Sequence, residues 1–289
     1  MRPKFVLAAL LPFFLVQAAS AQYYYKDVLS IRESVQQQQL YSQNRIRSVQ
    51  IQSFDPDGTE NKDFLCHQSV TSDYTVLETE SGSIATGKST LETTFSNDAD
   101  HSKVLRSEDS SRDAVTTTLY TYDARGSVAS ITSTSRTADT STTDTTNFSS
   151  TEAHLWQYDA AGHPTQMLRI KNYADTTFVR FQLDDKGNVS DEISVRKGAT
   201  TEHYYYYYDD NHHLTDIVRY NTHLAQMLPD YMFEYDATSG KLSKMTVVEA
   251  INSSYLVWYY EYNPDGLRVK EFCYDKSKQL IGTIGYTYR

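Results

Sequence analysis

The sequence predicts an all-β fold: a long antiparallel meander of repeated β-hairpins, curled into an open half-barrel or spiral sheet and preceded by one short helix. Three observations support this prediction. Tyr is abundant, at 24 of 289 residues, and aromatic side chains favour strands. Aromatic residues alternate with other residues ahead of recurring turns, which is the period of a strand. The turns themselves recur at a nearly constant spacing, as in repeat proteins.

Residues 1–21 have the pattern of a secretory signal peptide. Arg2 and Lys4 precede an apolar run over 5–16, and an Ala-x-Ala site ends at Ala21. The run is shorter than the about 20 apolar residues of a membrane-spanning helix. We therefore expect a mature chain that begins at Gln22 and no transmembrane helix. The protein is expected to be exported to the periplasm, the cell surface or the medium.

Residues 22–50 form an N-terminal segment that precedes the repeats. Ser30 is followed by Ile31, Val35 and Leu40 at helical spacing, which predicts a helix over about 31–43. The glutamine run at 36–39 leaves a second interpretation open, in which this segment is a polar tether.

A recurring unit, aromatic-x-aromatic-Asp-x-x-Gly, fills most of the predicted repeat domain at 51–289. Asp caps the backbone of a tight turn, and Gly three residues later accepts the positive φ that closes a bulged hairpin. Between successive units the Asp or Asn position moves by 25, 27 and 27 residues, from 184 to 209, 236 and 263. The predicted turn residues are Asp123 and Gly126, Asp159 and Gly162, Asp184 and Gly187, Asp236 and Gly240, and Asn263 and Gly266.

Two strands and two turns per repeat predict roughly 12 to 16 strands, and strand twist makes so wide a sheet curl. One long step separates the units at Asp123 and Asp159. It contains a Ser/Thr/Asp tract over 132–151 without apolar periodicity, which predicts a mobile loop.

The Tyr-x-Tyr-Asp-x-x-Gly-x-apolar unit resembles the YD repeat of the RHS family, well over 115–289 and poorly over 50–110. This resemblance implies a hairpin strip that winds into a shell or spiral, for which carbohydrate binding is often proposed. With Tyr23-Tyr-Tyr-Lys-Asp27 and Thr215-Asp-Ile-Val218, the sequence is also similar to uncharacterised exported proteins of Bacteroides-like bacteria. No toxin payload follows the last repeat, so the encapsulating role of large RHS toxins is not expected.

Charge and cysteine content restrict the possible partners. Removing Arg2 and Lys4 leaves 25 basic against 37 acidic residues, a net charge of 25 − 37 = −12. A nucleic-acid partner is therefore not expected, because phosphate binding needs a basic face. Cys66 and Cys273 are either paired or separately buried thiols, since spacing alone does not decide between them. The oligomeric state is also left open.

The sequence offers weak candidates for catalysis or metal binding. The densest histidine group has no recognised zinc spacing; it comprises His203, His212, His213 and His223. The acidic turns have no complete calcium loop, and turn capping explains them. Cys66 and His67 are too close in sequence to set an attack geometry by themselves, and no Gly-x-Ser-x-Gly occurs. We expect no enzyme activity, no metal and no cofactor.

The predicted function is therefore a non-catalytic envelope scaffold or binding surface for a carbohydrate or a protein. Exposed aromatic rings stack on sugar rings or peptide groups, and the candidate ligand-binding residues are Tyr204, Tyr205, Tyr206, Tyr207, Trp156 and Trp258. The alternative is an outer-membrane β-barrel, because aromatic strands and tight turns describe one equally well. Charged residues within strands weigh against a lipid-facing band, namely Arg169, Glu192, Lys244 and Lys270, with Asp191 beside Glu192.

Overall fold

The computed structural model describes residues 23–137, 148–221, 226–249 and 254–289. The expected signal peptide lies outside these residues. Within them, no helix is both long enough and apolar enough to cross a membrane.

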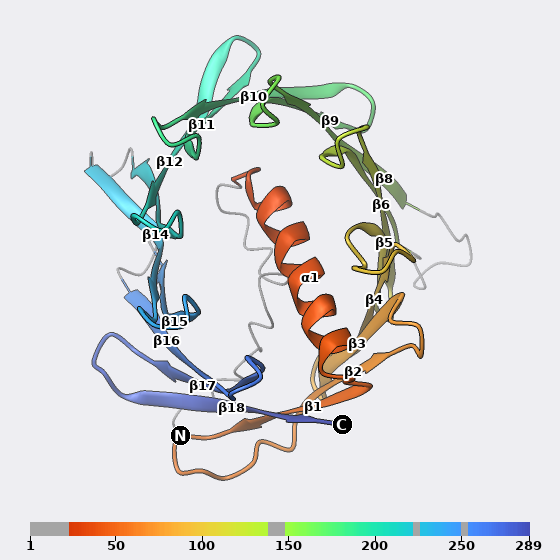
Figure 1. Cartoon of the computed structure of the whole chain (residues 1–289), viewed down its shortest axis with the longest axis vertical. Coiled ribbons are helices and arrows are strands. Elements are labelled where there is room, and N and C mark those ends of the chain that lie inside the picture. The colour runs from red at the N-terminus through yellow and green to blue at the C-terminus, as the bar shows by residue number, and fades with distance from the viewer. Residues whose placement is uncertain (1–22, 138–147, 222–225, 250–253) are drawn as a thin grey trace.

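The sheet is a closed ring of 18 antiparallel strands, in which β1 pairs with both β2 and β18 (Figure 1). The prediction of an open half-barrel or spiral is therefore wrong. The strands are β1 Ser48–Phe54, β2 Phe64–Val70, β3 Val76–Ser83, β4 Gly87–Phe95, β5 Val104–Ser110, β6 Ala114–Tyr122, β7 Val128–Thr137, β8 Phe148–Tyr158, β9 Pro164–Lys171, β10 Asp175–Leu183, β11 Val189–Arg196, β12 Ala199–Tyr208, β13 Leu214–Asn221, β14 Gln226–Tyr235, β15 Leu242–Glu249, β16 Ser254–Tyr262, β17 Arg268–Tyr274 and β18 Leu280–Tyr288.

Closure depends on contacts between the two ends of the repeat domain. Six residue pairs join β1 to β18, from Val49 opposite Tyr288 to Phe54 opposite Thr283. Sheet twist brings the first and last strands of a wide meander together, and closing the ring removes both unpaired edges. The strand count exceeds the expected range because residues 48–110 contribute five strands despite their weak repeat pattern.

Helix α1, Lys26–Gln43, lies inside the ring of strands (Figure 1). It begins five residues before the predicted start at 31 and ends where the sequence predicted. At its C-terminus the side chain of Asn44 donates to the Leu40 carbonyl oxygen, and Arg45 turns the chain at φ 57°. The chain then enters β1, so the helix is connected directly to the wall that encloses it.

The aspartate-glycine turns after β6, β8, β10, β14 and β16 lie at one end of the barrel, because every second connection of an antiparallel meander is on the same side. We call this the turn end. The turn at Asp55 and Gly58, between β1 and β2, lies at the other end. Gly126 and Gly187 have φ of 86° and 85°, and His212 takes the same place at φ 65°. The Asp123 carboxylate accepts the amide hydrogens of Arg125 and Ser127, at 2.9 Å each.

The tract at 132–151 contains more strand than the sequence indicated. β7 extends to Thr137 and β8 begins at Phe148, so ordered strands cover both of its ends. Residues 138–147, the remainder of the expected mobile loop, lie outside the described residues.

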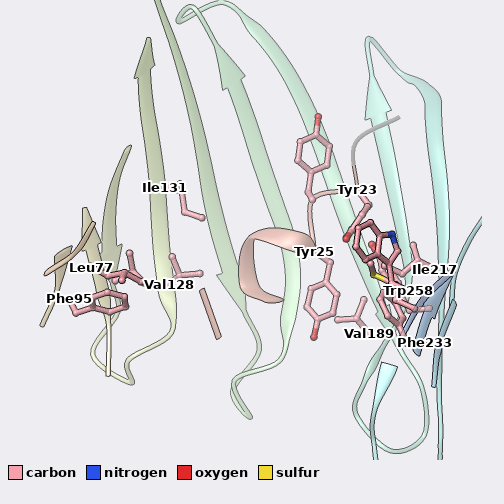
Figure 2. Packing of buried hydrophobic residues seen from close by; sticks show 14 of the residues in the cluster. Tyr23, Tyr25, Leu77, Phe95, Val128, Ile131, Val189, Ile217, Phe233 and Trp258 are labelled. Carbon is pink, nitrogen blue, oxygen red and sulfur yellow. The ribbon is translucent and has the colours of Figure 1, made fainter. Parts of the chain in front are cut away.

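The core lies on the inner face of the wall and around the start of α1. Figure 2 shows Tyr23 and Tyr25 from the N-terminal segment beside Val189, Phe233 and Trp258 of the wall. Aromatic residues of the repeats therefore pack inward against the enclosed segment.

Candidate functional site

The two aromatic residues of the repeat unit lie on the inner face of the wall. They are two residues apart on one strand, so their side chains share one face. The second one bonds to the neighbouring hairpin. The Tyr122 hydroxyl donates to the Val104 carbonyl oxygen at 2.7 Å, and that of Tyr262 to the Leu242 carbonyl oxygen at 3.0 Å. We call this set the tyrosine collar: Tyr122, Tyr158, Tyr235, Tyr262 and Tyr288. Its hydroxyls join successive repeats at the turn end.

The N-terminal end of α1 is held by one buried carboxylate on β11. Glu192 accepts the amide hydrogens of Tyr24 at 2.7 Å and Tyr25 at 2.8 Å, and the Tyr206 hydroxyl at 2.7 Å. Glu192 and Tyr206 are both buried. The first amides of a helix have no partner within it and favour a negative charge, so Glu192 replaces the side-chain cap that Tyr25 does not provide.

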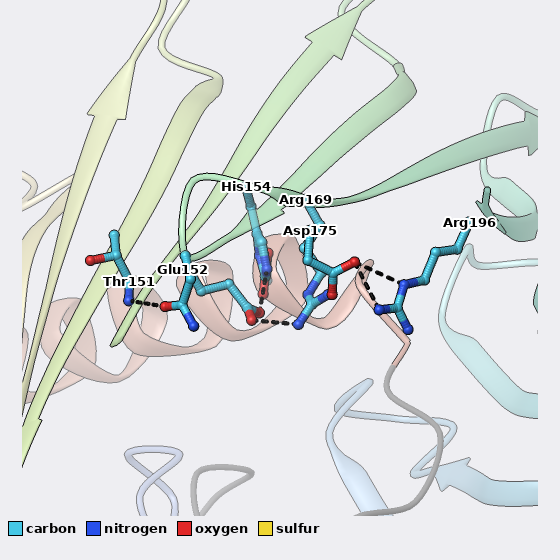
Figure 3. A network of polar contacts seen from close by, with 8 residues as sticks. Thr151, Glu152, His154, Arg169, Asp175 and Arg196 are labelled. Carbon is cyan, nitrogen blue, oxygen red and sulfur yellow. Dashed lines mark hydrogen bonds and ion pairs between the residues drawn. The ribbon is translucent and has the colours of Figure 1, made fainter. Parts of the chain in front are cut away.

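A charged network continues from the helix along the inner wall of β8 to β11 (Figure 3). The ring of His154 lies between Asp27 of α1, at 2.6 Å, and Glu152, at 3.0 Å. Arg169 donates to Glu152 at 2.7 Å and lies 3.7 Å from Asp175, which also pairs with Arg196 at 2.8 Å. These groups tie the helix start to four consecutive strands.

The other end of α1 is bound on the opposite side of the barrel by uncharged groups. The Tyr41 hydroxyl donates to Gln68 Oε1 on β2 at 2.7 Å. The Gln38 side chain donates to the Tyr74 carbonyl oxygen, and that of Gln39 to the Asp100 carbonyl oxygen at 2.9 Å. Tyr74 and Asp100 belong to connections at the turn end. Because both of its ends are fixed, α1 crosses the lumen and obstructs it there.

Away from the turn end, polar side chains line part of the lumen. Hydroxyls of β6 and β7 pair across the strands, Thr116 with Ser135 at 2.9 Å and Thr118 with Ser133 at 2.8 Å. They share the face of the buried Ile131, which is the inner face. This wall suits water or a polar ligand.

Outward-facing residues of β8 to β17 form an apolar belt, assigned by cross-strand register and by alternation with buried residues. We call it the apolar arc: Leu155, Leu168, Phe178, Ile193, Tyr205, Val218, Met232, Val257, Tyr259 and Phe272. Charged or titratable residues also lie within its rows, because Asp191 is opposite Tyr205, His203 is opposite Ile193 and Asp216 is opposite Met232. More of them lie toward the turn end. There Lys244 pairs with Glu234 at 2.6 Å, and Lys270 lies opposite Glu261.

The outer face of β3 to β5 has the opposite character. Glu78, Glu92 and Glu108 lie opposite one another on three neighbouring strands. Arg106 lies 3.5 Å from Glu92 and also pairs with Glu108. We call these outward residues, together with Glu80, the polar arc.

The wall divides the predicted ligand-binding residues between its two faces. Tyr204, Tyr206, Trp156 and Trp258 are buried on the inner side, whereas Tyr207 is 51% exposed on the outer side. Tyr205 also faces outward, and its hydroxyl bonds to His203, which bonds to Asp191. These six residues therefore do not form a single surface.

Other predicted candidates stay separate. Cys66 and Cys273 are free, buried thiols. Over the described ranges, no cluster of three or more His, Cys, Asp or Glu side chains has the arrangement of a metal site.

Sequence reasoning missed the residues that hold the helix: Glu192, His154, Arg169 and Asp27. Glu192 and Arg169 were noted only as charges within strands. Strand alternation was the available signal, because Glu192 and the aromatic Tyr206 lie on one face of adjacent strands. A charge on an aromatic face indicates a buried polar site when the sheet encloses a lumen.

No protein-family model and no curated protein matches the sequence. Among solved structures, a porin-like protein from Bacteroides uniformis is 9% identical, over 84% of this chain and 98% of that chain, with a TM-score of 0.39. A porin-like protein from Bacteroides vulgatus is 14% identical over the same shares, 84% and 98%, with a TM-score of 0.23. The structure of TcdB2-TccC3-TEV is 9% identical over 82% of this chain and 19% of that chain, with a TM-score of 0.30.

Two of these neighbours are porin-like proteins from Bacteroides. None of the comparisons supports the RHS resemblance. Scores this low carry no argument about function, which has to come from the barrel itself.

Proposed function

We propose that the chain is an outer-membrane β-barrel protein whose lumen is obstructed by its own N-terminal helix. The closed ring of 18 strands supports this alternative better than the open scaffold that the sequence favoured. An envelope barrel has no exposed sheet edge, and it satisfies its backbone groups between strands.

Closure of the sheet into a ring accounts for two of the charged residues that weighed against a barrel. Arg169 and Glu192 point into the lumen, where Glu152, Asp175 and the helix amides pair with them. Lys244 does face outward, but it pairs with Glu234 at the border of the apolar arc.

The apolar arc is the surface that we assign to lipid, because its apolar side chains alternate with the inner core. Within it, Asp191 is paired with His203, and Asp216 lies opposite Met232. The polar arc carries Glu78, Glu92 and Glu108 at mid-strand, where acyl chains would leave carboxylates without solvation. This side is assigned to a neighbouring protein in the membrane, so the barrel meets lipid along one side.

The obstruction by α1 argues for a binding or structural role rather than free diffusion through an open pore. The helix is fixed at both ends by groups on opposite walls. The proposal includes no catalytic step, and the absence of enzyme activity stays a prediction.

Fractionation of native cells tests the proposal. We expect the protein in the outer-membrane fraction, retained after carbonate washing and released by detergent. A soluble periplasmic protein treated in parallel is the control. Recovery of the protein in the carbonate supernatant would show that the apolar arc does not face lipid.

A further inference from the structure

A cavity of about 230 Å³ lies between the start of α1 and the inner wall of β9 to β12. Its lining consists of Tyr24, Arg169, Thr177, Ser194, Arg196, Thr201 and Glu202. The volume is sufficient for a molecule about the size of an amino acid or a monosaccharide. The contacts that hold α1 do not fill it.

Three polar groups of this lining lack a protein partner among the described residues. Ser194 is 2% exposed, and its Oγ makes no hydrogen bond. Nε of Arg169 is also buried without an acceptor. The inward-facing carboxylate of Glu202 takes part in none of the hydrogen bonds or ion pairs found there. Buried polar groups are nearly always paired, so unpaired ones around a cavity indicate a ligand or ordered water.

The charges around the cavity indicate what kind of ligand fits. Both arginines are already neutralised, Arg169 by Glu152 and Asp175, and Arg196 by Asp175. Glu202 has no direct ion-pair partner. The nearby Arg219, which pairs with Asp230, interacts with it electrostatically without contacting it. The ligand therefore needs a cationic donor for Glu202 and an acceptor for Ser194 and Arg169.

We propose that this cavity binds a small polar molecule that carries a primary ammonium group. The ammonium group pairs with Glu202, and an oxygen of the ligand accepts from Ser194 Oγ and Arg169 Nε. Free amino acids and amino sugars share this chemistry. The inference gives the barrel a ligand class and rests on the proposed binding role, but it does not depend on membrane insertion.

Calorimetric titration of the purified mature protein tests this site with pairs of probes that differ in the amino group. Glucosamine is compared with glucose, and serine with 3-hydroxypropionate. We expect binding of one or both amines and none of the amine-free partners. Binding of glucosamine would identify the ligand as an amino sugar, and binding of serine would identify it as an amino acid.

Two variants connect the binding to the cavity. Glu202→Gln should weaken amine binding at least about tenfold, since a hydrogen bond to a charged group contributes about 1.5 to 3 kcal/mol. Ser194→Ala should weaken it several-fold. Glu234→Gln makes the same chemical change on the outer face and should bind as the wild type does. Unchanged thermal stability of each variant excludes unfolding as the cause.

Either of two results would overturn the proposal: no heat of binding with either amine at millimolar concentration, or equal affinity of wild type and Glu202→Gln. The titration uses the protein from whichever fraction contains it. Failure of the membrane assignment and failure of the ligand assignment are thus separate outcomes.

Discussion

The two sides of the barrel wall, β3 to β5 and β8 to β17, have the same backbone pairing but different side-chain chemistry. The repeat-rich side packs aromatic rings inward and presents the apolar arc outward. On the repeat-poor side, Thr79 and Leu91 lie opposite each other on the inner face, while the polar arc lies outside. Closure of the barrel therefore requires hairpin geometry in every pair of strands. It requires the aromatic residues of the repeat in only some of the strands.

The same difference governs how the two sides hold α1. The repeat-rich side binds the helix start through Glu192 and His154. The repeat-poor side binds the helix end through Gln68 and two backbone carbonyls. Charged groups therefore anchor one end of the helix and neutral groups the other.

The largest expected effect is at the charged anchor. Glu192→Leu should lower the free energy of unfolding by about 3 to 5 kcal/mol, because three buried donors lose their acceptor. Gln68→Leu, at the neutral anchor, should cost only about 1 kcal/mol. Denaturant unfolding followed by the fluorescence of the buried Trp156 and Trp258 measures both. Equal losses would remove the distinction between the anchors.

The second largest effect is expected on the outer face of the barrel wall. Val218→Arg in the apolar arc should oppose membrane association by about 2 to 4 kcal/mol if that residue faces the bilayer midplane. Thr90→Arg, opposite Glu80 in the polar arc, is the matched control and should have little effect. The measurement is the share of each variant that sediments with outer membranes. A loss that is the same for both variants would contradict the assignment of lipid to one side.

Valine substitutions at the turn glycines distinguish the cost of backbone strain from the cost of side-chain crowding. Gly187→Val should cost about 1 to 3 kcal/mol, because a β-branched residue is forced to positive φ. An added Cβ there would also lie 3.0 Å from His163 Nε2, whereas at Gly126 it meets nothing within 4 Å. Gly126→Val should therefore be the milder change in thermal unfolding, and the same replacement of His212 milder still. Wild-type stability of Gly187→Val would disprove the turn model.

A smaller effect is expected in the tyrosine collar. Tyr262→Phe should cost about 0.5 to 1.5 kcal/mol, since it loses one hydrogen bond to the neighbouring hairpin. Tyr207→Phe, on the exposed outer face, provides the control and should be nearly neutral. A loss at Tyr207 as large as that at Tyr262 would show that the collar does not join the repeats.

The smallest expected effect concerns acid sensitivity beside the polar arc. In the β2–β3 turn, hydrogen bonds from Thr71 and Thr75 lower the pKa of Asp73 from its ordinary value of 3.8 to about 2. A carboxyl whose pKa falls on folding stabilises the fold above its unfolded pKa. That stabilisation is lost as the pH drops from about 4 to about 2. Asp73→Asn should flatten the stability profile over this interval, and an unchanged profile would exclude Asp73 as a contributor.

The turns and the helix could be predicted from the sequence because they depend mainly on residues that are close together in the chain. Asp184 and Gly187 form their turn through contacts within five residues. The spacing of Ile31, Val35 and Leu40 indicated the helix, but its start at Lys26 depends on Glu192, 166 residues away from it in the sequence. The export signal is likewise a local pattern, and it stays a prediction.

Closure and the direction of each face were decided by tertiary structure. Alternation shows that Tyr204 and Tyr206 share one face and that Tyr205 and Tyr207 share the other, but not which face is inside. That choice depends on the pairing of β1 with β18, which joins the two ends of the domain. Once the ring closes, Arg169 and Glu192 become luminal groups beside the helix. The sequence by itself determined the hairpins and turns, whereas the lumen and its cavity exist only because strands remote in sequence pair with each other.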